Sequence, residues 1–477
     1  MRGRRAKTSL GSISAVGAGS NSRRGTSSSI RRCWPIGTRG AAPGPCFGWN
    51  GPRSRGHAAE GGHMPGPLEG IVVVEAAQVI SGPLAGMLLA QQGADVIKVE
   101  PPGHGDPTRL SGHRRAGASA IFANCNRAKR SVVLDATDPR GLELLIELVG
   151  RADVFTQNFR PGKAAKLGVG PEAMLARNPG LVYASIYGYG PDGPFAGRKV
   201  YDYVVQAAIG MADSQRSRPE GRPSLVRNYV IDKATSWATA QAVTAALLAR
   251  ERDPARRGQH VELSMLDVGV EFFWPDGMVD HTFLEDEGTE KVPLNLDFYD
   301  AYPTRDGAVA VYPVVPSFFA GLCDALGHPE WREDPRFADH ANRRRTMAEF
   351  APLVGEALAG FTTEEAVGRL VAADVAAAAV VPVHLATEHP QVRWNGSVVE
   401  RVDPQLGRIQ GPRHAPRFGA APASPSPPLG DVPGLGQHTT EVLLGLGLSE
   451  AEVEALREEG VVGGPSATHK QSLGPLR

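Results

Sequence analysis

The sequence predicts an α/β protein whose large domain contains a doubly wound parallel sheet. Apolar, β-branched runs alternate with helical stretches from Leu68 to about residue 264. The first strand, helix and strand together span about thirty residues, the size of one βαβ unit. The runs are continuously apolar, as expected of strands buried on both faces. With 477 residues, 42% of them hydrophobic, the chain can also bury the core of a second domain.

The predicted elements follow one another in βαβ order. A strand at 71–74 precedes the Gly82-Pro83 turn, a helix at 84–92 and a second strand at 94–100. Further strands are expected at 132–134, 154–157, 181–186 and 260–264, and further helices at 139–149, 171–177 and 234–252. Because crossovers between parallel strands are right-handed, this alternation builds a Rossmann-like sheet with helices on both faces.

The large domain is expected to consist of residues 64–282 and of a return of the chain at 391–462. Residues 283–390 mix a short strand pair around Asp306 with helices near 316–326 and 344–372, which predicts a smaller α+β domain. A Pro/Ser linker at 421–434 leads to a terminal helix that Ser449 and Glu452 open with capping-box spacing. Residues 463–477 are expected to be a disordered tail.

Residues 1–63 are rich in Arg, Ser and Gly and lack hydrophobic periodicity, which predicts a disordered extension. Its composition suits either an organelle transit peptide or an upstream start codon ahead of a natural initiator at Met64. Trp, Pro and Gly persist where an amphipathic targeting helix would be needed, so the second explanation is favoured. We therefore expect a cytoplasmic protein, with mitochondrial import as the less favoured alternative.

The charge balance argues against a nucleic-acid surface. Eleven of the 51 Lys and Arg residues lie before Met64, together with one of the 51 acidic residues, Glu60. Residues 64–477 therefore carry 40 basic and 50 acidic residues. Binding to phosphate backbones requires clustered cations. The sequence also contains no run of 18 apolar residues, so no membrane-spanning helix is predicted.

Several common catalytic and cofactor motifs are absent from the sequence. Residues 78–86 read QVISGPLAG, so no GxGxxG follows the first strand, and HExxH, GxSxG and the P-loop motif do not occur. The four cysteines form no CxxC pair, so neither a disulfide framework nor a metal site is predicted. Cys125 has no local His or helix start to activate it and is expected to be a small buried hydrophobe.

Asp232 is the residue best placed to carry chemistry. It closes the apolar segment at 229–231 and opens the predicted long helix, so its side chain is expected at a helix N-terminus. That position alone favours a structural N-cap. The same N–H groups and the helix dipole would keep the carboxylate ionised and nucleophilic, and a thioester would be its natural electrophile. Both roles are open on this evidence.

Short motifs in a fixed order point to a family. They are Ser81-Gly82-Pro83, GADVIKVE at 93–100 followed by Gly105-Asp106, Lys129-Arg130-Ser131, Asn158-Phe159-Arg160-Pro161-Gly162, Arg257-Gly258-Gln259-His260-Val261 and Ser264-Met265-Leu266-Asp267. Each motif alone is weak. Their order and spacing resemble the class III CoA-transferase family of formyl-CoA and carnitine CoA-transferases and methylacyl-CoA racemases, over nearly all of residues 64–460.

The resemblance implies that Asp232 is a nucleophile. Its carboxylate would attack a donor thioester to give an aspartyl anhydride and CoA thiolate, which returns to form an aspartyl-CoA thioester. An acceptor carboxylate then takes the CoA through a second anhydride. Because the steps exchange acyl groups of similar energy, the protein supplies orientation and oxyanion stabilisation. Coenzyme A is then a substrate, and no cofactor or metal is expected.

The resemblance also implies a CoA site. Arg160, Lys166 and Lys199 would pair with CoA phosphates, and the alternative for each is a solvated surface charge. Pro101 replaces an arginine found in some members. The implied residues are Val79, Ile80, Leu134, Asp135, Ala136, Thr137, Asn158, Phe159, Arg160, Lys166, Lys199, Val200, Tyr201 and Asp202.

Two alternatives to CoA transfer remain, a 2-methylacyl-CoA racemase-type isomerase and a non-catalytic CoA-binding protein. Racemisation needs an acid and a base on opposite faces of the α-carbon. The racemase branch supplies a histidine where this chain has Tyr201, and a tyrosine, which titrates near pH 10, is a poor base at neutral pH. Transfer from an acyl-CoA to a carboxylic acid acceptor is therefore favoured. Asp202 would orient Tyr201 or cap a helix, and the resemblance implies an interlocked homodimer.

Overall fold

The computed structural model describes residues 66–216, 221–285, 287–290, 292–294, 296, 299–312, 315–418 and 430–463. The disordered extension predicted at 1–63 lies outside the described residues. The same is true of residues 464–477 of the predicted tail and of the linker segment 421–429. Gly463, predicted to begin the tail, instead ends a strand.

The main sheet of the described chain has seven strands in the order β14-β5-β2-β1-β6-β7-β8. Neighbouring strands are parallel except β14, which runs antiparallel to β5. The predicted α/β class with a parallel sheet is therefore confirmed. The strands are β1 (Val72–Ala76), β2 (Asp95–Glu100), β5 (Lys129–Leu134), β6 (Val154–Gln157), β7 (Val182–Tyr187), β8 (His260–Ser264) and β14 (Val462–Gly463).

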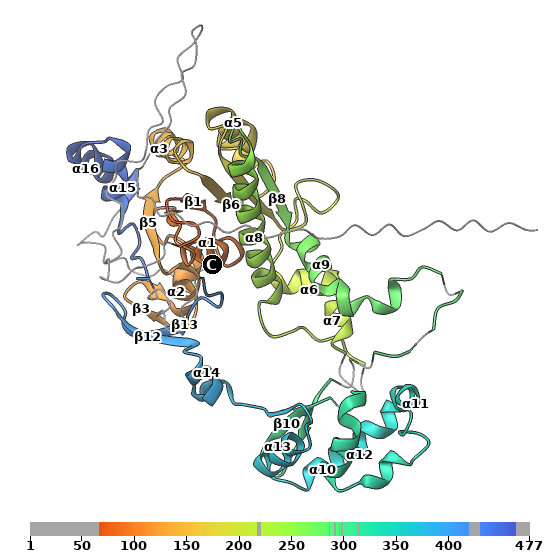
Figure 1. Ribbon diagram of the computed structural model, residues 1–477. Helices are drawn as coiled ribbons and strands as arrows, with labels where there is room; N and C mark the ends of the chain where they lie inside the picture. Colours follow the sequence, from red (N-terminus) through yellow and green to blue (C-terminus); the bar gives the residue numbers. More distant parts are fainter. Residues whose placement is uncertain are drawn as a thin grey trace, which may run out of the picture. The chain divides into compact units, whose positions relative to one another are not determined.

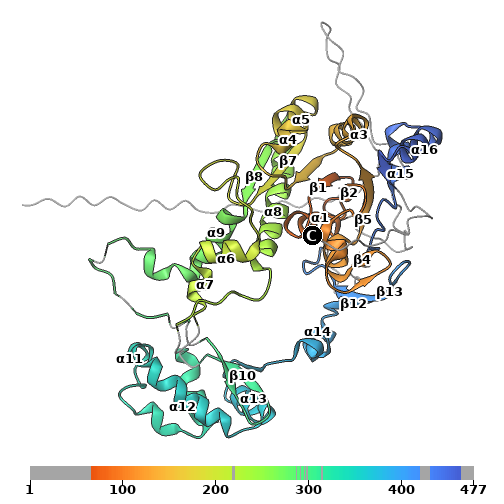
Figure 2. The same ribbon diagram turned by 180° about the vertical axis from the view of Figure 1, so that it is seen from behind.

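Helices cover both faces of this sheet (Figure 1, Figure 2). Val73 and Val154 pack on one face against α1 (Ser81–Ala90) and α8 (Val230–Arg252). Their neighbours Val74 and Phe155 enter the core on the other face. That core also contains residues of α3 (Pro139–Gly150), α5 (Pro171–Arg177), α15 (Thr439–Leu446) and α16 (Glu450–Glu458). Successive strand residues thus pack into cores on opposite faces of the sheet. The C-terminal helices α15 and α16 contribute to the core that contains Val74 and Phe155.

The strand order reverses at β1. Strands β2 and β5 lie on one side of β1, whereas β6, β7 and β8 lie on the other. In doubly wound sheets, ligands bind outside the carboxyl ends of the strands at such a reversal. A ligand-binding site is therefore expected at the loops that follow β1 and β6.

The structure tests three of the helix starts predicted from the sequence. Helix α16 begins at Glu450, and the capping box predicted from Ser449 and Glu452 is confirmed. Both helices that border the candidate site begin earlier than predicted, α1 at Ser81 and α8 at Val230. The remaining described α-helices and strands outside residues 301–379 are β3 (Arg114–Arg115), β4 (Ala118–Ser119), α2 (Ala120–Asn126), α4 (Lys163–Lys166), α6 (Asp202–Ala208), α7 (Met211–Ser214), α9 (Met265–Gly277), α14 (Pro390–Trp394), β12 (Val398–Asp403) and β13 (Gly407–Pro412).

Residues 301–379 form a core of their own. Strands β9 (Ala301–Pro303), β10 (Ala308–Val311) and β11 (Ala377–Ala379) make an antiparallel sheet, and the strand pair predicted around Asp306 is β9 and β10. The helices of this region are α10 (Phe319–Leu326), α11 (His340–Arg345), α12 (Met347–Ala359) and α13 (Thr363–Ala372). Phe337 and Phe350 are fully buried in the core. Across the described ranges, no helix is long and apolar enough to cross a membrane.

Candidate functional site

The candidate nucleophile lies where two helices begin. Asp232 is the third residue of α8, whose N-cap residue is Tyr229, and Ser81 is the first residue of α1. The Ser81 hydroxyl donates a hydrogen bond to Oδ1 of Asp232. Asp232 is 8% exposed and Ser81 5% exposed. Because α1 and α8 pack against each other, the carboxylate is held beside the N-terminal turns of both helices.

The interpretation of Asp232 as an N-cap is wrong. Helix α8 begins two residues before Asp232, so this side chain belongs to the first turn. Asp202, the first residue of α6, caps α8 instead. Its Oδ2 accepts hydrogen bonds from the backbone N–H groups of Ile231 at 2.7 Å and Asp232 at 3.0 Å. Of the two roles left open for Asp202, the structure shows the helix cap, and this leaves the carboxylate of Asp232 to face Ser81.

The electrostatic environment of Asp232 is unusual for a buried acid. Burial raises its pKa, hydrogen bonds from Ser81 lower it, and the charge of Asp202 raises it further. No cation contributes to this balance among the residues that the structure describes. Asp202 accepts from the N–H groups of Ile231 and Asp232, so these two donors of α8 do not bind the carboxylate of Asp232. The donors of Ser81 are the groups that oppose burial.

The loop between β1 and α1 is fixed by side chains from two other segments. Val79 has a φ of 74°, a left-handed conformation that costs energy for a β-branched residue. Its N–H group points to the Asp106 carboxylate, at 3.3 and 3.4 Å. The Asn158 side chain, after β6, accepts from the N–H group of Gln78 at 3.0 Å and donates to its carbonyl at 2.8 Å. The strained loop conformation is therefore held from both sides.

Two buried lysines anchor the ends of this loop. Lys98 Nζ lies 3.1 Å from Glu75 Oε1 and 2.9 Å from Asp106 Oδ2, and it donates to the carbonyl of Ala77 at 2.9 Å. Lys129 Nζ lies 2.8 Å from Glu75 Oε2 and donates to the carbonyl of Pro83 at 2.6 Å. Ser81 lies between these two anchored carbonyls, so the buried ion pairs set the position of its hydroxyl.

The ion-pair network extends to a third cation. Arg109 binds Glu100 in a bidentate geometry, at 2.8 Å through Nε and 2.7 Å through Nη2, and Glu100 also accepts from the N–H group of Asp106 at 2.9 Å. Although burial opposes it, the charges of Glu75, Asp106 and Glu100 raise the pKa of Lys98. Burial lowers the pKa of Lys129 to about 8. Three carboxylates thus face three cations, and the network is internally neutral.

The predicted CoA residues lie on segments that follow the carboxyl ends of parallel strands. Val79 and Ile80 follow β1, and Leu134 ends β5 ahead of residues 135–137. Residues 158–160 follow β6, Lys166 ends α4, and residues 199–202 lead from β7 into α6. Because the strands are parallel, these segments share one edge of the sheet. The carboxylate of Asp232 lies at the same edge, through its contact with Ser81.

The exposure of these residues separates them into three groups. Arg160, Lys166 and Lys199 are exposed, as are Thr137 and Tyr201, whereas Val79, Asp135, Ala136, Asn158, Phe159 and Val200 are half-buried and Ile80, Leu134 and Asp202 are buried. Asp135 accepts from the N–H group and the hydroxyl of Thr137, at 2.9 and 2.6 Å, which closes a turn after β5. Contact of any of them with CoA stays a prediction.

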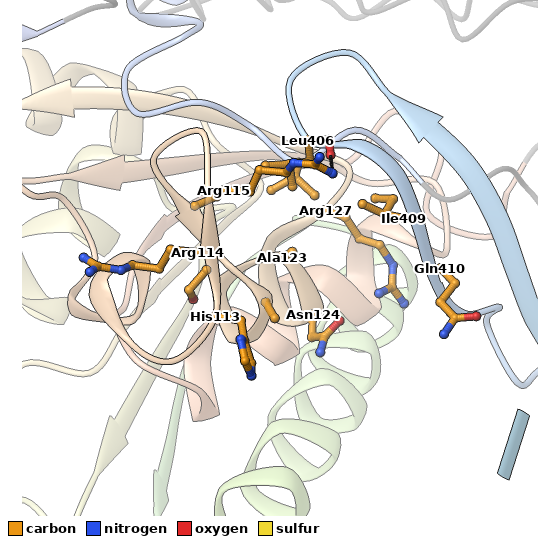
Figure 3. Close-up of a pocket in the computed structure, with 13 residues that line it drawn as sticks. His113, Arg114, Arg115, Ala123, Asn124, Arg127, Leu406, Ile409 and Gln410 are labelled. Atoms are coloured by element: carbon orange, nitrogen blue, oxygen red, sulfur yellow. Dashed lines mark hydrogen bonds between the residues drawn. The ribbon is translucent and has the colours of Figure 1, made fainter. Parts of the chain in front are cut away.

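Two cavities adjoin near this loop. The larger, about 460 Å³, lies between α1, α2, α8 and residues 412–415, and its wall includes Ile80 and Lys233, sequence neighbours of Ser81 and Asp232. The smaller, about 250 Å³, lies beside the β3–β4 hairpin and β13 (Figure 3). Arg127 is in both walls, and its Nη2 donates to the carbonyl of Pro412 at 2.9 Å. A mostly apolar cavity thus borders the loop that holds the candidate nucleophile.

Cys125 is buried in the wall of the larger cavity, as predicted for a small hydrophobe. Burial raises the pKa of its thiol to about 11, which disfavours the thiolate that a nucleophile would need. Within the described part of the chain, no group of three or more His, Cys, Asp or Glu side chains could hold a metal ion.

Sequence reasoning missed Ser81 as the partner of Asp232. It noticed Ser81 only within a motif, because 151 positions separate the two residues. The ion-pair network was missed as well, although a signal for it exists. Glu75 and Lys98 interrupt apolar strands that are buried on both faces, and charges at such positions need partners inside the protein.

Comparison with known proteins identifies the family of this chain. The model of "CoA-transferase family III" matches residues 68–439. The "Probable fatty acyl-CoA transferase Rv3272" of Mycobacterium tuberculosis is 36% identical over 315 residues, 63% of this chain and 78% of the relative. The "Succinyl-CoA--D-citramalate CoA-transferase" of Chloroflexus aurantiacus is 30% identical over 404 residues, 83% of this chain and 98% of the relative.

Solved structures show the same likeness. A crystal structure of Rv3272 aligns with a TM-score of 0.68 and 32% identity, over 79% of this chain and 99% of that chain. A CAIB/BAIF family protein from Brucella suis aligns with a TM-score of 0.68 and 30% identity, over 80% of this chain and 100% of that chain. On sequence and on fold, this chain belongs to CoA-transferase family III, and the relatives named above are CoA-transferases.

Proposed function

We propose that the enzyme moves CoA from an acyl-CoA thioester to a carboxylic acid, with Asp232 as the nucleophile. The observation that carries this proposal is the environment of the Asp232 carboxylate. It is 8% exposed and faces the Ser81 hydroxyl, and no cation from the described residues compensates its charge. Buried structural carboxylates are ordinarily paired with cations. An unpaired, raised-pKa carboxylate at the carboxyl edge of the sheet is therefore a functional candidate.

The proposed reaction uses Asp232 twice. Its carboxylate attacks the donor thioester, and the CoA thiolate leaves as an aspartyl anhydride forms. The thiolate then attacks the aspartyl carbonyl, releases the donor acid and gives an aspartyl-CoA thioester. The acceptor carboxylate attacks this thioester, and the returning thiolate takes the acceptor acyl group from the second anhydride. Each step exchanges one activated acyl group for another, so positioning and charge stabilisation carry the catalysis.

The relatives support transfer between carboxylic acids in general. The names of three relatives pair an acyl-CoA with D-citramalate, oxalate or glutarate. For this chain we propose an acyl-CoA donor and a carboxylic acid acceptor, with the exposed cations Arg160, Lys166 and Lys199 as partners of the CoA phosphates. An interlocked homodimer in the cytoplasm is part of the same proposal. Light scattering on active enzyme tests it, and an active monomer would contradict the dimer.

The decisive test is replacement of the nucleophile. Asp232→Ala and the isosteric Asp232→Asn should each lower transfer by about 10⁴-fold or more, as for removal of other covalent nucleophiles, while CoA still binds. In the wild-type enzyme incubated with an acyl-CoA panel, mass spectrometry should find an acyl or CoA adduct on the peptide that contains Asp232. Unchanged turnover in either variant, or an adduct elsewhere, would exclude Asp232 as the nucleophile.

The same preparations distinguish transfer from racemisation. With a 2-methylacyl-CoA in deuterium oxide, a transferase should pass CoA to an added acid without exchanging the α-proton. Rapid α-proton exchange without CoA transfer would instead establish the isomerase. If neither reaction occurs and CoA binds, the chain is a CoA-binding protein.

A further inference from the structure

The Ser81 side chain has no structural task that its surroundings reveal. Helix α1 has Ile80 as its N-cap residue, without a side-chain capping bond. Ser81 is 5% exposed, and apart from Asp232 its hydroxyl approaches only Sδ of Met265, at 4.0 Å, among the described side chains. The hydroxyl is therefore committed to the carboxylate of Asp232, where any catalytic charge would develop.

We propose that the Ser81 hydroxyl is a catalytic oxyanion donor to the carbonyl group that Asp232 itself becomes. This inference rests on the proposed function. When Oδ2 of Asp232 attacks a thioester, Oδ1 becomes the carbonyl oxygen of the aspartyl anhydride. Ser81 already donates to Oδ1. Any nucleophile that adds to Cγ pushes the carbonyl electron pair onto this same atom, so the donor is in place before the charge appears.

Two steps of the cycle pass through this oxyanion. In the first, the CoA sulfur bonds to Cγ, and the bond from Cγ to the donor carboxylate breaks as the electron pair returns from Oδ1. In the second, an acceptor carboxylate oxygen bonds to Cγ, and the bond from Cγ to sulfur breaks and releases the thiolate. Ser81 keeps its proton in both steps. It contributes by stabilising negative charge and does not act as an acid or a base.

The loop gives this donor the rigidity that such stabilisation requires. The carbonyls of Ala77 and Pro83, on either side of Ser81, are held by Lys98 and Lys129. A Cβ atom on Gly82 would lie 2.2 Å from Cβ of Ala77, so the backbone next to Ser81 is tightly packed. A preorganised donor costs no reorganisation when the charge develops.

The test separates the steps of a single turnover. Rapid quench after mixing with an acyl-CoA, followed by intact-mass analysis and thiol titration, measures how fast the aspartyl-CoA adduct replaces free thiolate. Ser81→Ala should slow this step by about 10²-fold, the usual effect of losing one oxyanion donor. Ser81→Thr, which keeps the hydroxyl, should restore most of the rate. The acid limb of the pH profile of kcat/KM should move to higher pH in Ser81→Ala, because the lost donor opposes the raised pKa of Asp232.

Ser236→Ala is the matched control. The Ser236 hydroxyl is also buried, and it donates to the backbone carbonyl of Asp232 at 2.8 Å without touching the carboxylate. This variant should keep the wild-type rate of adduct formation and the wild-type acid limb. Equal slowing in Ser81→Ala and Ser236→Ala, or an unchanged rate and acid limb in Ser81→Ala, would overturn the proposal.

The controls also separate this inference from the function on which it rests. Urea unfolding verifies that each serine variant is folded, and Ser81→Thr decides the question if Ser81→Ala is not. An adduct on wild-type Asp232 with no effect of Ser81 refutes the oxyanion role alone. Absence of any adduct on wild-type Asp232 refutes the proposed function itself.

Discussion

Buried carboxylates lie on both sides of the loop between β1 and α1. Those on one side are paired with cations, whereas Asp232 on the other side is not. Glu75, Asp106 and Glu100 face Lys98, Lys129 and Arg109 at ion-pair distance. Arg109 and Lys98 outweigh burial and lower the pKa of Glu100. Lys98, together with hydrogen bonds from Thr108, outweighs burial and lowers the pKa of Asp106. Asp232 has only the neutral donors of Ser81, and its pKa is raised.

The difference shows how one loop can be both rigid and reactive. A carboxylate neutralised by a buried cation is fixed in place and is a weak nucleophile, whereas one held by a hydroxyl keeps its charge available for an electrophile. The loop receives its rigidity from the first arrangement through the carbonyls of Ala77 and Pro83. It presents the second arrangement at Ser81.

Removal of one network cation should have the largest effect on stability. Lys98→Met leaves the buried carboxylates of Glu75 and Asp106 short of one positive charge. Loss of one member of a buried ion pair typically costs about 3–5 kcal/mol, and urea unfolding should show a loss of this size. Arg140→Met, which breaks ion pairs of an exposed arginine with Asp138 and Glu459, is the control and should change little. Similar losses in both variants would mean that the network does not stabilise the fold.

Two glycines one turn apart in α1 allow the network and the site to be disturbed separately. A Cβ atom on Gly86 would lie 1.9 Å from Oε2 of Glu75, whereas one on Gly82 would lie 2.2 Å from Cβ of Ala77. Gly86→Ala should therefore lower the free energy of unfolding by about 1–3 kcal/mol, the usual cost of overpacking. Gly82→Ala should carry a similar overpacking cost and should in addition lower turnover per folded molecule, because it displaces Ser81.

Unfolding and turnover measured on both glycine variants decide between these outcomes. A large loss of turnover in Gly86→Ala, with Gly82→Ala close to wild type, would show that the network and the site are not divided as the structure indicates.

The strands and helices that could be predicted from the sequence are those with a repeating hydrophobic pattern. Apolar β-branched runs fixed the predicted strands, and β6 and α5 have the predicted bounds, because buried strands and amphipathic helices leave local patterns. The start of α8 was misplaced because its cap is not local. Asp202, 29 positions before Ile231, supplies it. A sequence pattern shows which residues favour caps, but it does not show which distant side chain will reach the helix.

The candidate site also has features that the sequence predicts and features that it does not. Asp232 was found through its position and through the family motifs, whereas its contact with Ser81 joins segments 151 positions apart. The raised pKa of Asp232 depends on burial and on Asp202, and both follow from tertiary packing. The presence of buried charges could have been predicted from the sequence, since Glu75 and Lys98 interrupt apolar strands. The partners of these charges could not be predicted, because any of several acidic residues could have paired with Lys98 or Lys129.

The smallest predicted effect on stability, and the one of opposite sign, concerns Asp232→Asn. Because the pKa of Asp232 is raised in the folded state, its contribution to stability is fully present below the unfolded value of about 3.9 and is lost as the pH rises through the folded value. Asn keeps an acceptor for Ser81 without the charge. Asp232→Asn should therefore match the wild type in acid and become slightly more stable than it as the pH rises toward neutrality.

Glu100→Gln provides the contrast within the same experiment. The pKa of Glu100 is lowered, so its contribution is present above the unfolded value of about 4.3 and is lost as the pH falls. Glu100→Gln should be less stable than the wild type near neutrality, and this difference should shrink in acid. Urea unfolding of the three proteins between pH 4 and 7 tests both signs at once. If Asp232→Asn is instead destabilised, by an amount that grows with pH, Asp232 is a compensated structural carboxylate, and the contrast between the two sides of the loop does not hold.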